Sequence, residues 1–135
     1  MNTLVRWGKF NLVGAVGMTV QLASLAIFNW LWPGHYLLAT AAALELTLAH
    51  NFVWHIRFTW RDRRHRSPLA GQFIRFHVSN GLVSLVGNLA LMPFLVEGAR
   101  IPVVWANLIA ILACSIVNFC LGNSWAFAET QKVKA

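Results

Sequence analysis

The sequence predicts an all-α polytopic membrane protein in which four transmembrane helices form two parallel-repeat helical hairpins. Three observations lead to this fold class: an excess of apolar residues, four apolar stretches of membrane-spanning length, and an internal repeat. Hydrophobic residues make up 58% of the 135 residues and charged residues only 11%, whereas soluble domains have roughly 45–50% and about 25%. A soluble domain of this size has too little interior for so much apolar surface, so we expect much of it to face lipid.

The repeat relates the two halves of the chain at a constant offset of 67 positions, from Asn51-Phe52 to Asn118-Phe119. Each Asn-Phe pair is followed by two aromatic residues, at positions 58 and 60 in the first copy and 125 and 127 in the second. Other pairs at the same offset are Gly14 with Gly81, Gln21 with Asn88, Ala39 with Ala106, and Ala43 with Ala110. A repeat in constant register determines the architecture, and this one predicts two copies of one unit.

We expect one membrane domain, residues 1–135, with spans at about 10–30, 36–56, 76–96 and 103–123. Each span has about the 20 residues that a bilayer core requires. The first two are joined by a turn at Pro33-Gly34, because this dipeptide is typical of turns. A basic loop, residues 57–75, leads to the third span, which Pro93 should kink or end. A second turn at residues 97–102 leads to the fourth span.

The cations predict the orientation of these spans. Of the eleven Lys and Arg residues, two precede the first span, six lie in the central loop and two lie in the C-terminal tail; Arg100 is the exception. The positive-inside rule therefore predicts that both termini and the central loop are cytoplasmic. Both halves then enter the membrane from the same side, which makes the repeat parallel.

A net charge of +7 is also typical of nucleic-acid-binding proteins. Here the cations flank apolar spans and form no extended basic face, so we expect membrane lipids and no nucleic acid as partners. Cys114 and Cys120 lie in one span, and His50 and His55 have no third ligand spaced with them, so we expect neither a disulfide nor a metal site. The sequence contains no nucleophile–base pair, Gly-rich phosphate loop or catalytic carboxylate pair, so we expect no enzyme activity and no cofactor.

Polar residues inside the expected spans are the candidate binding residues. Glu45 is the only acidic residue in a span, and its carboxyl group could bind a polar ligand or take up a proton; alternatively, it is a packing residue. Asn51 and Asn118 occupy equivalent positions of the repeat, where an amide can bridge helices or bind a phosphate or sugar. A bridging role accounts for the presence of an Asn in both copies without any ligand. Gln21 and Asn88 form the other equivalent pair.

Basic and aromatic residues are expected at the cytoplasmic surface. Arg57 follows Asn51 by six residues, where a lipid phosphate would lie, with Arg61 and Arg75 behind it. A guanidinium group fits phosphate oxygens with two parallel hydrogen bonds, although plain positive-inside charge explains the remaining arginines of the loop. An inner belt of aromatic residues is expected to anchor the protein at the headgroup level: Trp7, Trp54, Phe58, Trp60, Phe73, Phe76, Trp125 and Phe127.

These segments together resemble the GtrA-like family. The resemblance rests on the opening Arg6-Trp7-x-Lys9-Phe10, the Asn51-Phe52 close of the first half with its basic and aromatic residues, and the Asn118-Phe119 close of the second. It covers about Arg6 to Phe127. The chain departs from the family pattern in two places: Gly122-Asn123-Ser124 stands where a basic residue is usual, and no acidic residue lies near Gln21.

The resemblance implies translocation of a polyprenyl-phosphate-linked sugar across the bacterial cytoplasmic membrane, for a glycosyltransferase of envelope polysaccharide synthesis. In this hypothesis Arg57 and its neighbours receive the phosphate, and the sugar passes polar residues of the spans: Gln21, Glu45, Asn88, Asn107 and Asn118. Four short helices enclose little volume, so a homo-oligomer or a glycosyltransferase partner is expected. One alternative is a non-transporting protein that anchors a glycosyltransferase. Another is a proton-coupled drug exporter, a class that relies on a first-span carboxylate missing here.

Overall fold

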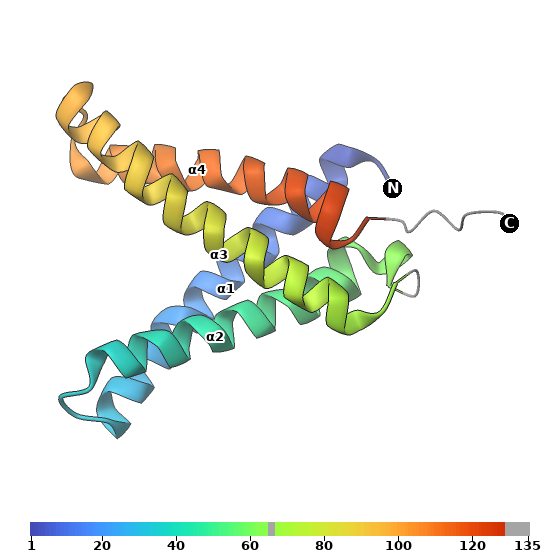
Figure 1. Ribbon diagram of the computed structural model, residues 1–135, viewed down its shortest axis with the longest axis horizontal. Coiled ribbons are helices and arrows are strands. Elements are labelled where there is room, and N and C mark those ends of the chain that lie inside the picture. The colour runs from blue at the N-terminus through green and yellow to red at the C-terminus, as the bar shows by residue number, and fades with distance from the viewer. Residues whose placement is uncertain (65–66, 129–135) are drawn as a thin grey trace, which may run out of the picture. The chain divides into compact units, whose positions relative to one another are not determined.

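The computed structural model describes residues 1–64 and 67–128, except for the side chains of residues 36, 37, 85, 88, 103, 104 and 107. In this part of the chain the secondary structure is helical. The chain divides into two compact units, Met1–Arg64 and His65–Ala135, and each unit contains one helical hairpin (Figure 1). The all-helical fold class and the division into two hairpins are as the sequence predicts.

The first unit consists of two long helices and two short helical turns. Helix α1 (Thr3–Leu31) begins at Asn2, whose side chain accepts a hydrogen bond from the backbone N–H of Leu4 at 3.1 Å. This contact satisfies one of the N–H groups that a helix start leaves unpaired. The predicted turn follows, with Gly34 at a φ of 80° that favours glycine. Helix α2 (Tyr36–Trp54) then continues into the π-helical turn η1 (His55–Thr59) and the 3-10 turn η2 (Arg61–Arg63).

The second unit also has two long helices and two short helical turns, but one of its turns lies between the two helices. Helix α3 (Leu69–Pro93) begins directly after Pro68, and its α-helical hydrogen bonding changes at Pro93, which lacks the backbone N–H that an α-helix needs. The chain continues into the π-helical turn η3 (Phe94–Gly98). After the connection at residues 99–102, helix α4 (Val103–Leu121) leads into the π-helical turn η4 (Gly122–Ala126).

The sequence repeat is also a repeat of backbone conformation. Helices α2 and α4 begin and end at positions that differ by the same 67 residues, and so do the π-helical turns η1 and η4. Both turns close alike: the N–H of Trp60 donates to the carbonyl of His55 at 2.7 Å, and the N–H of Phe127 donates to that of Gly122 at 2.9 Å. The paired alanines of the repeat are buried in both copies: Ala39, Ala43, Ala106 and Ala110. The repeat therefore fixes the end of each hairpin as well as its helices.

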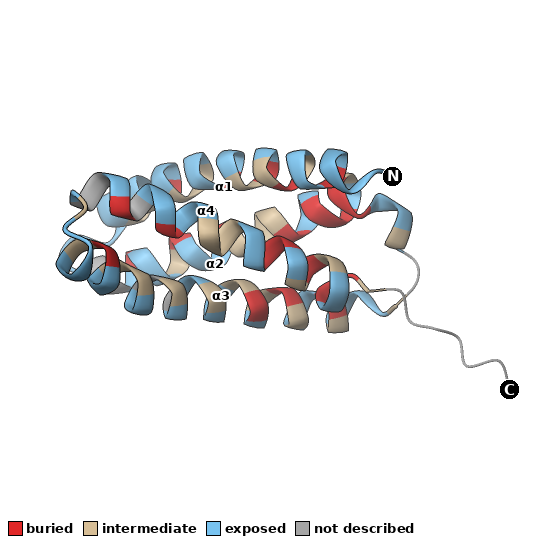
Figure 2. Ribbon diagram, turned by 90° about the horizontal axis from the view of Figure 1, so that it is seen from above, coloured by how far each residue is buried: buried red, intermediate tan, exposed pale blue. Residues whose placement is uncertain are grey.

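Exposed residues occur along the whole length of the helices (Figure 2), and many of them are large and apolar. Leu22 in α1 is 64% exposed and Leu89 in α3 is 69% exposed, as expected for surfaces that face lipid. Within residues 1–64 and 67–128, three helical stretches are long and apolar enough to cross a membrane: Thr3–Leu31, Leu69–Gly98 and Leu108–Ala126. Helix α2 is not one of the three. Its 19 residues would nevertheless reach about 28 Å at 1.5 Å per residue, close to the thickness of a bilayer core.

The first helix of each hairpin begins earlier than the corresponding expected span. Helix α1 starts at Thr3 rather than residue 10, and α3 starts at Leu69 rather than residue 76. The segment expected as a loop, residues 57–75, accordingly contains part of η1, all of η2 and the first turns of α3. Lys9 and Arg75 are therefore held on helices, and Arg61 is held on the short turn η2.

In each hairpin, one glycine allows the two helices to approach each other closely. A Cβ atom at Gly17 of α1 would overlap the side chain of Asn51 in α2, and one at Gly87 of α3 would overlap the sulfur of Cys114 in α4. A Cβ atom at Gly14, one turn from Gly17, would meet no atom within 4 Å. Small residues at such positions are typical of packed membrane helices.

We therefore predict that Gly17→Ala destabilises the first unit, whereas Gly14→Ala does not. Overpacking of this kind costs about 1–3 kcal/mol in free energy of unfolding, and alanine at an open helical position gains up to about 1 kcal/mol over glycine. Chemical unfolding of the purified protein in mixed micelles measures both changes. Equal stabilities for the two variants would contradict the close approach at Asn51.

Candidate functional site

An aromatic cluster joins the beginning of α1 to the end of α2. The ring of Phe10 stacks on His55 with centroids 4.8 Å apart, and both rings meet Trp60 edge-on, at 5.9 and 5.3 Å. The Nδ1 atom of His55 lies 3.1 Å from the hydroxyl oxygen of Thr59, within hydrogen-bonding distance. All four side chains are buried. The cluster therefore fixes η1, and with it η2, against the first turns of α1.

Three members of the expected aromatic belt are core residues instead. Trp60 is 0% exposed, and Phe76 and Phe127 are each 1% exposed; the rings of Phe76 and Phe127 lie 5.8 Å apart in the second unit. Their side chains are buried within the two units and therefore offer no surface for anchoring to lipid headgroups. Trp54 and Trp125 are exposed, as expected of aromatic residues that anchor a protein at the headgroup level.

An ion pair forms a second connection at the same end of the first unit. The Nη2 atom of Arg6 lies 2.6 Å from Oδ2 of Asp62, which links α1 to η2. The side chain of Arg6 is 8% exposed and that of Asp62 is 45% exposed. Sequence reasoning missed this pair, because the two residues are 56 positions apart and no local pattern connects them.

The ion pair lies beside a cavity of about 340 Å³ lined by Met1, Lys9, Phe58, Arg61 and Asp62. The Nζ atom of Lys9 lies 4.6 Å from the centre of the Phe58 ring, a cation–π contact that holds the amine at the cavity. In the described part of the chain, neither Lys9 nor Arg61 forms a salt bridge with a carboxylate. The cavity therefore offers two cations to an anionic ligand. We refer to it as the cation cavity.

An apolar groove of about 210 Å³ adjoins the cation cavity. It is lined by Leu12, Val13, Val16, His50, Trp54 and Phe58, from α1, α2 and η1. Phe58 lines both spaces, so a charged cavity and an apolar groove share one side chain. An amphipathic molecule with an anionic head and a hydrocarbon tail matches this arrangement.

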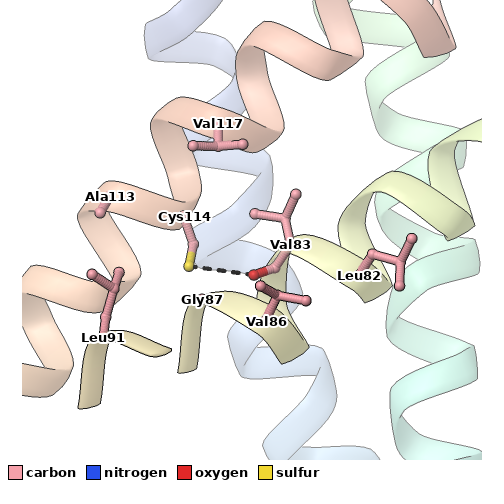
Figure 3. Close-up of a pocket in the computed structure, with 8 residues that line it drawn as sticks. All are labelled: Leu82, Val83, Val86, Gly87, Leu91, Ala113, Cys114 and Val117. Carbon is pink, nitrogen blue, oxygen red and sulfur yellow. Dashed lines mark hydrogen bonds between the residues drawn. The ribbon is translucent and has the colours of Figure 1, made fainter. Parts of the chain in front are cut away.

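The second unit has an apolar groove without cations, between α3 and α4 (Figure 3). Its volume is about 370 Å³, and its lining residues are Leu82, Val83, Val86, Gly87, Leu91, Ala113, Cys114 and Val117. The thiol of Cys114 points toward the carbonyl oxygen of Val83 at 3.6 Å. By the repeat, Phe76 stands in place of Lys9 and Ala128 in place of Arg61. The second copy therefore lacks the cations that line the cavity in the first.

Four of the residues that the sequence suggested as binding residues lie in the first unit. Gln21 is half-buried on α1, Glu45 is exposed on α2, and Arg57 is exposed on η1. Asn51 is half-buried on α2, packs where Gly17 leaves space, and lies 3.2 Å from Nδ1 of His50. None of the four lines the cation cavity or the groove. Arg57 is nevertheless next in sequence to Phe58, which lines both.

The other three lie in the second unit. Asn118 is buried on α4, and within the described residues its Oδ1 atom has no hydrogen-bond partner. Arg75 is half-buried on α3, and its Nη2 atom donates to the carbonyl of Ala126 at 3.5 Å, so it holds the end of η4. The side chain of Asn88 lies outside the described residues, as does that of Asn107. Binding roles for these residues stay predictions.

Sequence reasoning treated Lys9 as one of the cations that flank the first span and did not place it in a site. A signal was present, because Lys9 occurs one residue before Phe10 and the family resemblance includes both. Its meaning depends on the fold of η1, which brings Phe58 to the amine.

Comparison with protein families supplies an independent finding. The family described as "GtrA/DPMS, transmembrane domain" matches residues 9–132, which include both hairpins and begin at Lys9. No curated protein matches the chain.

The aromatic cluster predicts unequal roles for two tryptophans of the first unit. Trp60→Ala should lower the free energy of unfolding by about 3–5 kcal/mol, because it empties a fully buried position. Trp54→Ala should lower it by less than about 1 kcal/mol, since that side chain is 49% exposed. Unfolding in mixed micelles, followed by far-UV circular dichroism, measures both. If the two losses are equal, Trp60 does not hold the end of the hairpin.

Proposed function

Because the chain belongs to the GtrA/DPMS transmembrane domain family, a family of four-span membrane domains, we propose that it moves a polyprenyl-phosphate-linked sugar across a membrane. The family is associated with translocation of polyprenyl-linked sugars, and its members are small membrane proteins that are generally non-catalytic. Family membership supports a lipid-linked sugar as the class of ligand. The first unit suggests where such a ligand would bind.

The observation that carries the proposal is the cation cavity beside the apolar groove. The phosphate of the ligand is received by Lys9 and Arg61, while the prenyl chain lies along the groove past Phe58 and Trp54. The ammonium group of Lys9 acts as a compact point charge, and the guanidinium group of Arg61 can donate two parallel hydrogen bonds to phosphate oxygens. A single binding site thus provides both a polar and an apolar compartment, as the ligand requires.

We propose that this site lies on the cytoplasmic side of a bacterial inner membrane, with both termini on that side, and the positive-inside rule supports this orientation. The ligand is then taken up from the cytoplasmic leaflet and delivered to the opposite one. The sugar passes the polar residues of the spans, for which Gln21, Glu45, Asn88 and Asn118 remain the candidates. Arg57 adds positive charge beside Phe58 in the first unit, and Arg75 remains a candidate phosphate-binding residue of the second unit. Transport of this kind makes and breaks no covalent bond.

Two further elements of the proposal concern partners. Each hairpin exposes long apolar surfaces, so assembly with further copies or with a glycosyltransferase is compatible with the fold. An anchoring protein without transport activity would need those surfaces but not the cation cavity. Replacing the cations of the cavity therefore distinguishes a transporter from an anchoring protein.

We predict that replacing the two cations of the cavity slows transport at least about tenfold in reconstituted liposomes. Hydrogen bonds to charged groups are worth about 1.5–3 kcal/mol each, and about 1.4 kcal/mol corresponds to a factor of ten. The assay measures the rate at which a fluorescent polyprenyl-phosphate sugar reaches the opposite leaflet. The test variant is Lys9→Gln combined with Arg61→Gln.

The matched control is Arg64→Gln, which removes an exposed cation from the same segment but not from the cavity; its rate should stay within about twofold of the parent, as for an exposed charge. Glu45→Gln in the same assay reports whether the carboxyl group of the second span takes part. Transfer by the folded parent no faster than in empty liposomes would reject transport and favour the anchoring role.

A further inference from the structure

A phosphate-binding site at the surface of a membrane is surrounded by competing lipids. Glycerophospholipids such as phosphatidylglycerol also carry a phosphodiester with one negative charge, and they are in large excess over any lipid-linked sugar. Lys9 and Arg61 of the cation cavity attract both kinds of phosphate, because the charge is the same. Selectivity for the proposed ligand therefore requires a residue other than these cations.

The two classes of lipid differ in the atoms that follow the phosphate. A prenyl phosphate continues directly into a single hydrocarbon chain. A glycerophospholipid continues into glycerol esters, whose carbonyl oxygens accept hydrogen bonds and are hydrated at the membrane surface. Placing such an oxygen against an apolar surface without a donor costs free energy. A side chain that contacts the ligand directly beyond its phosphate can therefore distinguish the two classes.

Phe58 is placed where this contact would occur. It is half-buried on η1 and lines both the cation cavity and the apolar groove. The centre of its ring lies 4.6 Å from Nζ of Lys9. A ligand with its phosphate at Lys9 and Arg61 and its chain in the groove thus places the first atoms of the chain beside this ring. The ring has no hydrogen-bond donor for an ester carbonyl.

The rest of the groove offers no compensation to a polar group. Its surface is apolar over the described residues, and besides Phe58 it is lined by Leu12, Val13, Val16, His50 and Trp54. The polar side of His50 is engaged elsewhere, since its Nδ1 atom lies 3.2 Å from Oδ1 of Asn51, which does not line the groove. An ester group that followed the phosphate past Phe58 would lose its hydration and gain no hydrogen bond.

We propose that Phe58 is a specificity-determining residue that admits lipid phosphates whose chain is apolar from its first carbon and disfavours glycerophospholipids. The inference rests on the proposed function, because it takes the cation cavity as the phosphate site. Lys9 and Arg61 then supply affinity for the phosphate, whereas Phe58 supplies selectivity for the prenyl chain. Trp125 occupies the equivalent position of the repeat, but it is 44% exposed and does not line the groove of the second unit.

The experiment measures competition for the full-length protein in micelles of an uncharged detergent, which contain no phospholipid. A bound fluorescent prenyl-phosphate sugar is displaced by a prenyl methyl phosphodiester or by an acyloxyethyl methyl phosphodiester with the same number of carbons. The two competitors have the same head group and charge, and only the second has an ester next to the phosphate. With concentrations expressed as mole fraction in the micelle, the parent should prefer the prenyl diester by at least about fivefold, as expected for an ester carbonyl without a donor.

Phe58→Asn and Phe58→Gln should reduce the preference to within about twofold, because an amide N–H can donate to the ester carbonyl. Phe58→Leu should retain the preference, since it keeps the apolar contact and removes only the cation–π contact with Lys9. Trp125→Asn, the matched change in the second unit, should also retain it. Far-UV circular dichroism verifies that each variant is folded.

Two results would overturn the inference: equal affinities of the parent for the two competitors, or an unaltered preference in the folded amide variants of Phe58. The first of these needs no variant, so it stands even where a substitution prevents folding. Failure of the parent to bind the prenyl diester at all would instead reject the proposed function.

Discussion

The packing of Phe10, His55 and Trp60 determines the geometry on which the proposed site depends. These rings hold the π-helical turn η1 against the start of α1, and the Arg6–Asp62 ion pair holds the following turn η2 to the same helix. Only with both turns in place does Phe58 contact the amine of Lys9 and Arg61 line the same cavity. A π-helical turn often marks a functional position within a helix, and here it redirects the chain at the boundary between apolar and charged surface.

The two units show how one backbone can carry different chemistry. Helices α2 and α4 and the turns η1 and η4 coincide along the repeat, yet Lys9 corresponds to Phe76 and His55 corresponds to Gly122. The first copy combines a cation cavity with an apolar groove, whereas the second has an apolar groove lined by Cys114 and aliphatic side chains. The repeat therefore preserves the hairpin, and the charged site belongs to the first copy.

The fold was predictable from sequence because its determinants are local or periodic. Apolar stretches of bilayer length identify helices, Pro33-Gly34 identifies a turn, and the constant register of Asn51 and Asn118 identifies the repeat. The site was not predictable in the same way. It depends on the contact of Lys9 with Phe58 and on the ion pair of Arg6 with Asp62, which join residues far apart in sequence through a turn whose π-helical form has no clear sequence signal.

The inner aromatic belt shows the same limit of pattern reasoning. Composition and position gave no means of separating Trp60, which is buried, from Trp54, which is exposed. Trp54 is the last residue of α2, whereas Trp60 follows the turn η1 and packs against Phe10 and His55. The preference of tryptophan for the membrane boundary is a statistical tendency. Whether a particular tryptophan is exposed there or buried in the core depends on tertiary packing.

Photolabelling tests the central claim most directly, because it asks which unit holds the lipid. A prenyl phosphodiester with a photoreactive group near the end of its chain would be bound to the protein in nanodiscs, irradiated, and located by peptide mass spectrometry. The account predicts labelling in the groove of the first unit, at Leu12, Val16 or Trp54, that an excess of unlabelled diester prevents. Competable labelling confined to the groove of the second unit, at Leu82, Val86 or Val117, would contradict it.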